Sequence, residues 1–124
     1  MIEIPVMGHE FPKVMIGGVP FEVRMNETDI LETQVRLFNQ FNQLKRSRAN
    51  RDNAPHGAQL RYVEQVVQLK RDMAAFVDNV LGEGAFAAIS GGGFVDDQTL
   101  AEITVKVREA AIEAIAEAVE RRYE

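Results

Sequence analysis

Three long stretches of the chain repeat apolar residues at steps of three and four, the spacing that gathers them on one face of an α-helix. They run from Asn26 to about Arg48, from Ala58 to Leu81, and from Asp96 or Asp97 to about Arg122. In the second stretch the repeating positions are Leu60, Val63, Val66/Val67, Lys70, Met73/Ala74, Val77 and Val80/Leu81. The pattern predicts three long helices. The first two are joined by a loop over residues 49–57, rich in Asn, Asp, Pro and Gly, and should lie antiparallel.

The last of these stretches carries more apolar surface than one packing partner needs. One stripe consists of Leu100, Ile103, Val107, Ala110/Ala111, Ala114 and Ala118, and an adjacent one of Val105, Ile112, Ile115 and Val119. Two interpretations stay open for this double stripe. Either the helix is wedged between two others in a three-helix core, or the second stripe meets another chain.

The N-terminal part of the chain alternates apolar and polar residues, which favours β-structure. Residues 14–16 and 19–25 flank Gly17-Gly18, and two glycines supply the positive φ angles of a tight hairpin turn. Before the hairpin, Pro5, Gly8 and Pro12 interrupt the chain, so that segment is either an arm or a short extra strand. The expected fold class is α+β, mainly α, in a single domain over residues 1–124, with 1–25 as hairpin and arm and 26–124 as the helical part.

A glycine-rich corner joins the second and third helices. Gly82 stands where a helix end favours a residue without a Cβ, and Gly84 opens a short helical turn over residues 84–90. Phe86 and Ile89 of this turn can face back onto the preceding helix. Gly91-Gly92-Gly93 then lets the chain change direction before Asp96-Asp97 begins the last helix.

This corner resembles that of the tail assembly chaperones of long-tailed, siphovirus-type bacteriophages and prophages. In that family a helix often ends in Asp-x-hydrophobic-hydrophobic-Gly-Glu-Gly, followed by an apolar residue, a small or Gly-rich turn and a final helix. The matching positions are Asp78, Val80, Leu81, Gly82, Glu83, Gly84, Ile89 and Gly91. Two positions depart from the pattern, because the family usually has Phe where Leu81 stands and often an aromatic residue where Ser90 stands.

The resemblance implies a protein that binds the tape-measure protein, and possibly the tail-tube protein, before the tail tube polymerises, and that is absent from the finished virion. It also implies work in the cytoplasm of the bacterial host. The partner-binding residues expected by analogy are those of the corner and of the second stripe. They are Leu81, Gly82, Glu83, Gly84, Phe86, Ile89, Ile112, Ile115 and Val119.

Composition removes several other classes of function. The chain has a net charge of −5 and no cysteine, which argues against non-specific nucleic-acid binding and excludes disulfides and thiol chemistry. No apolar run approaches the roughly 20 residues of a membrane span, and no signal peptide precedes the hairpin, so we expect a cytosolic protein. His9 and His56 fall in expected loops and form no zinc motif. No residues suggest catalysis, and we expect no enzyme activity, no cofactor and no metal.

Alternatives to a chaperone remain. A virion structural component, such as a tail-completion or head–tail connector subunit, would form a ring. A small helical interaction, regulatory or nucleic-acid module would use the basic run of Lys45, Arg46, Arg48 and Arg51. A solvated helix end is the favoured explanation of that run, because no aromatic residues are interleaved with it. A minor enzyme subunit is a third class, for which the chain offers no residue. A homo-oligomer is a further alternative that the sequence leaves open.

Overall fold

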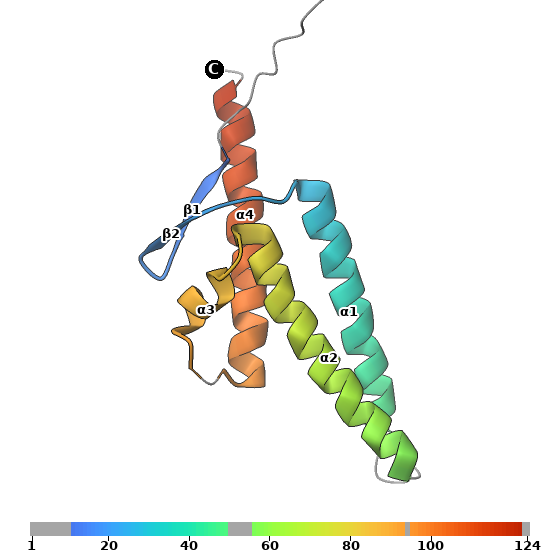
Figure 1. The fold of residues 1–124 in the computed structure, drawn as a ribbon. Helices are drawn as coiled ribbons and strands as arrows, with labels where there is room; N and C mark the ends of the chain where they lie inside the picture. The colour runs from blue at the N-terminus through green and yellow to red at the C-terminus, as the bar shows by residue number, and fades with distance from the viewer. Residues whose placement is uncertain (1–10, 50–55, 94, 123–124) are drawn as a thin grey trace, which may run out of the picture.

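The computed structural model describes residues 11–49, 56–93 and 95–122 (Figure 1). The elements are β1 (Lys13–Ile16), β2 (Val19–Glu22), α1 (Glu27–Ala49), α2 (His56–Leu81), α3 (Ala85–Ser90) and α4 (Asp97–Arg122). The antiparallel pair α1 and α2 lies along one side, α4 packs on α2, and the small sheet packs on α4 and α3. The predicted mainly helical α+β fold, with three long helices, a hairpin and a short helical turn, is confirmed.

The hairpin forms as its two glycines predict. Gly17 and Gly18 have φ angles of 59° and 78°. The two strands pair antiparallel, with Val14 opposite Phe21 and Met15 opposite Pro20. The second strand is shorter than the alternation suggests and ends at Glu22, because the backbone beyond it turns to other partners.

Two backbone hydrogen bonds follow β2, the first between the two arms of the hairpin and the second from the hairpin to α2. The amide of Val23 donates to the carbonyl of Pro12 at 2.7 Å, and the amide of Arg24 donates to the carbonyl of Val80 at 2.6 Å. Val23 itself is buried in the main core. The hairpin, which would be marginal alone, therefore gains its stability from packing on the helices.

Side-chain caps begin two of the long helices. The Oδ1 atom of Asn26 accepts the amide of Asp29 at 2.8 Å, and that of Asp96 accepts the amide of Thr99 at 2.7 Å. The hydrogen bond from the Thr99 amide is the main reason that the pKa of Asp96 lies below its usual range, since it favours the ionised carboxylate. Both residues act as the sequence predicts.

The start of α2 corrects the sequence analysis. The helix begins at His56, two residues earlier than expected, so His56 is helical and not part of a loop. A proline restricts the residue that precedes it and not the residues that follow, so a helix can begin directly after Pro55. His9, Arg51, the N-terminal segment and most of the expected loop lie outside the described residues.

The core gathers where α1, α2, α4 and the hairpin meet. Its most deeply buried side chains are Ile30, Phe76, Val77, Val80 and Val107. The first stripe of α4 supplies Val107, Ala111 and Ala114 to this core, so the three-helix packing left open by the sequence is present. This core occupies one half of the helical hairpin, because α4 begins only at the level of Lys70, whose Nζ lies 2.6 Å from Asp97 Oδ1.

Candidate functional site

The glycine corner is a tight joint between α2 and α3. Gly82 and Gly84 both have positive φ angles, 107° and 85°. The amide of Gly82 donates to the carbonyl of Asp78 at 2.8 Å, and the amide of Ala85 donates to the carbonyl of Gly82 at 3.1 Å. With these bonds α2 ends and α3 begins within a few residues.

The Asp78 side chain holds the second half of this joint. Its Oδ1 atom accepts the backbone amide of Phe86 at 2.8 Å, which satisfies one of the free amides at the start of α3. Phe86 and Ile89 pack against the core, as the sequence predicts. Leu81 is only 4% exposed, so its side chain serves the interior. The corner therefore sets the path of the chain, and only Glu83 and Gly84 of its predicted residues are exposed.

The second stripe of α4 is partly covered. Ile112 and Ile115 are half-buried against the same core that holds Leu81 and supports Phe86 and Ile89. Val119 remains 41% exposed, and Val105, at the other end of the stripe, is also exposed. The structure thus gathers most of the predicted residues around one core and leaves the two ends of the stripe open.

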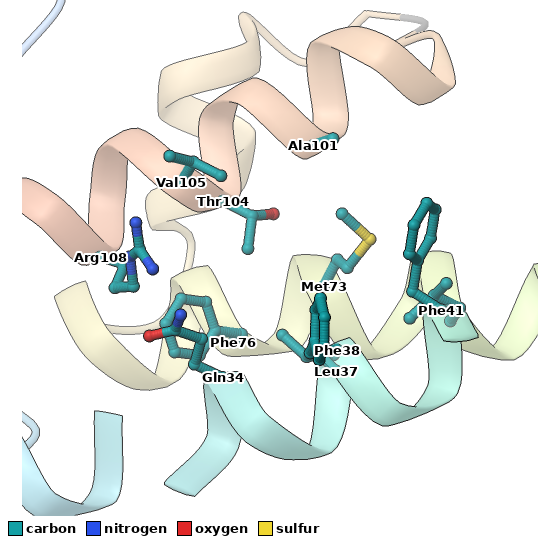
Figure 2. A pocket seen from close by; sticks show the side chains of 11 residues that line it. Gln34, Leu37, Phe38, Phe41, Met73, Phe76, Ala101, Thr104, Val105 and Arg108 are labelled. Carbon is teal, nitrogen blue, oxygen red and sulfur yellow. The ribbon is translucent and has the colours of Figure 1, made fainter. Parts of the chain in front are cut away.

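An apolar groove between α1 and α4, with α2 as its floor, is a surface that the sequence analysis did not predict (Figure 2). Its cavity measures about 340 Å³. The lining residues are Gln34, Leu37, Phe38 and Phe41 of α1, Leu69, Met73 and Phe76 of α2, and Ala101, Thr104, Val105 and Arg108 of α4. We call this surface the α1–α4 groove.

The groove exists because α1 and α4 both pack on α2 while making few contacts with each other. Phe38 is consequently 61% exposed, and Phe41 is exposed as well, although both belong to the apolar stripe of α1. A second cavity of about 340 Å³ adjoins the first and shares Phe41 and Met73 with it. Together the two cavities make a longer apolar channel between the helices, and from here on the name α1–α4 groove covers both cavities.

Cations stand at both ends of this channel. Arg108 lines one end, where its guanidinium lies 3.4 Å from the Glu109 carboxylate. Lys45 lines the other end, and its Nζ lies 4.9 Å from the centre of the Phe41 ring. Lys70 and Asp97 also line that second end but pair with each other. The interior of the channel is therefore apolar and its two ends carry positive charge.

A second open apolar surface follows α2 beyond the start of α4. Leu60, Val63 and Val67 continue the three- and four-residue steps that lead to Val77 and Leu81, and we call these three residues the distal stripe. Val77 is fully buried, whereas Val63 is 56% exposed. One continuous helical stripe is thus covered at its C-terminal end and open at its N-terminal end.

Two kinds of feature, metal-type side-chain clusters and unpaired buried polar atoms, are absent from the part of the chain that the structure describes. No group of three or more His, Asp or Glu side chains is arranged to hold a metal ion there. Within the same ranges, every buried side-chain nitrogen or oxygen atom has a hydrogen-bond partner. Across residues 11–49, 56–93 and 95–122, no helix combines the length and apolar character that crossing a bilayer requires.

The site is thus an apolar channel with a cationic side chain at each end. Comparison with protein-family models, with curated proteins and with solved structures gave no match to this chain.

Proposed function

We propose that this chain is a tail assembly chaperone of a long-tailed bacteriophage or prophage, and that it binds helical segments of the tape-measure protein in the cytoplasm of the host. The observation that carries the proposal is the α1–α4 groove, an apolar channel bounded by helices. Such a groove suits the apolar stripe of an amphipathic helix. The likeness of the corner between Asp78 and Gly91 to the chaperone family supplies the identity of the client.

The exposed aromatic side chains of the groove support a role in shielding apolar clients. Monomeric proteins rarely leave large contiguous apolar surface in water unless a partner covers it. Phe38, Phe41 and Val105 are all exposed here, on two helices that face each other. A client helix laid between them buries apolar groups of both molecules and keeps the client from aggregating before tail assembly.

The proposal is tested by co-expression of the chain with the tape-measure protein of the genome that encodes it. We expect the two proteins to co-purify, and we expect the soluble fraction of the tape-measure protein to rise. Phe38→Asp places a charge in the groove and should abolish co-purification, because a carboxylate buried against an apolar stripe loses its hydration. Val35→Asp is the matched control, since Val35 is 57% exposed on the same helix but does not line the groove.

The alternatives give different results in the same preparation. A fixed ring in light scattering that stays in assembled virions would indicate a structural tail or connector subunit and would overturn the chaperone proposal. A shift of duplex DNA that weakens steeply with salt would indicate a nucleic-acid module. Equal capture of the tape-measure protein by the Phe38→Asp and Val35→Asp variants would show that the groove is not the client site.

A further inference from the structure

We infer that the α1–α4 groove selects a particular kind of amphipathic helix, one that carries acidic side chains at both ends of its apolar stripe, three helical turns apart. The inference rests on the proposed function in placing a helix in this groove, and it adds the chemistry by which the groove recognises that helix. The inference follows from the positions of the cationic side chains at the two ends of the groove.

The two ends of the groove that hold Arg108 and Lys45 are a defined distance apart along the helices. Arg108 lines the first cavity on α4, and Asp97 marks the opposite end of the channel on the same helix, 11 residues earlier. On α1, Gln34 lines the first cavity and Lys45 the second, again 11 residues apart. At 1.5 Å per residue each helix therefore spans about 16 Å between the ends.

That spacing matches the repeat of a bound helix. Three turns of 3.6 residues take about 11 residues, so two side chains separated by this interval return to the same face. A helix lying along the groove can therefore place one acidic residue near Arg108 and another near Lys45. The apolar residues between them fall onto Phe38, Met73 and Val105.

The charged side chains of the groove favour a bound helix with acidic rather than basic residues at the ends of its apolar stripe. Among the residues that line the two cavities, Arg108, Lys45 and Lys70 are cations and Asp97 is the one anion. Lys70 pairs with Asp97, whereas the Nζ atom of Lys45 contacts the face of the Phe41 ring. Arg108 contacts Glu109, and because a guanidinium has five N–H donors it can bind a second carboxylate at the same time.

Designed peptides test this recognition with the full chain. The first is a capped helical peptide with two glutamates three turns apart and leucines on the same face between them. The second has lysines in place of those glutamates, and the third has the glutamates moved to the opposite face at constant composition. By fluorescence anisotropy we expect the first peptide to bind, and the other two to bind roughly tenfold or more weakly.

Variants of the chain identify the cations. Lys45→Glu should lower the affinity for the glutamate peptide and raise the affinity for the lysine peptide. A change in folding cannot produce such a reversal. Arg108→Gln should also lower the affinity for the glutamate peptide. Arg36→Gln is the control, since Arg36 is exposed on α1 and does not line the groove, and it should leave all affinities unchanged.

The outcomes separate this inference from the proposed function. Equal binding of the three peptides, or no reversal with Lys45→Glu, overturns the role of the charged ends even if the tape-measure protein co-purifies. Preference for the glutamate peptide without capture of the tape-measure protein keeps the inference and overturns the chaperone proposal. Failure of every peptide to bind overturns the inference.

Discussion

Gly82 shows how a single residue controls the path of this chain. Its φ angle of 107° lies in a region that side chains with a Cβ rarely adopt, and a Cβ built there would meet the Nε atom of Arg24 at 3.2 Å. Arg24 is held nearby by its backbone bond to Val80 and by the stacking of its guanidinium 5.1 Å from the centre of the Phe11 ring. Backbone conformation and close approach therefore both require glycine.

Gly82→Val should lower the free energy of unfolding by about 1–3 kcal/mol, because a β-branched side chain strains this backbone conformation. Urea denaturation followed by circular dichroism measures the change. Gly93→Val is the control, since the φ angle there is not positive and a Cβ would meet nothing within 4 Å. Equal stability of the two variants would show that the corner does not depend on Gly82.

At the level of elements, the short helix α3 depends on one side chain of its neighbour. An isolated helix of six residues is far below the length that is stable in water, so tertiary contacts must hold it. Ala85 supplies buried packing, and the Asp78 carboxylate accepts the Phe86 amide from across the corner. Gly84, with its left-handed backbone and no side-chain cap of its own, leaves that capping role to Asp78.

Asp78→Ala should lower the free energy of unfolding by about 1.5–3 kcal/mol, the usual range when a hydrogen bond to a charged group is lost. Asp78→Asn keeps an oxygen acceptor in the same place and should recover most of that loss. Thermal denaturation of both variants measures the difference. The expectation fails if Asn is as destabilising as Ala, or if neither variant differs from the parent.

At the scale of the whole molecule, the pair of helices α1 and α2 extends past the start of α4. The salt bridge between Lys70 and Asp97 marks the point where α4 begins. The N-terminal part of α2, which carries the distal stripe, extends past the start of α4 (Figure 1). The same face of α2 is therefore buried at Val77 and open at Val63. Burial of apolar surface supplies most of the free energy that holds a helix in place, so the two halves of α2 should differ in local stability.

Hydrogen exchange followed by mass spectrometry should show this difference within one helix. Amides in the range 76–81 should exchange only through global unfolding, whereas amides in the range 60–67 should exchange faster through local opening. Added client helix should slow exchange at Phe38 and Phe41 if the groove is its site. Uniform protection along α2 would contradict the expected difference in local stability between its two halves.

Much of the fold followed from local patterns. The boundaries of α1, of α4 and of the C-terminal end of α2 and the glycine turn of the hairpin were predicted, because each depends on residues close in sequence. The start of α2 and the end of β2 were misplaced by a few residues, since helix and strand ends depend on weak local preferences. The inward role of Phe86 and Ile89 was also predicted.

The groove was not predicted, and the reason is physical. Periodicity shows that Phe38, Phe41 and Val105 lie on apolar faces, but the exposure of a face depends on what packs against it. Because α1 and α4 both pack on α2 and contact each other little, those side chains stay open, whereas Ile112 and Ile115 pack against the core. Helix identity and position thus follow from short-range spacing along the chain, whereas the open surface arises from contacts between residues that are far apart in sequence.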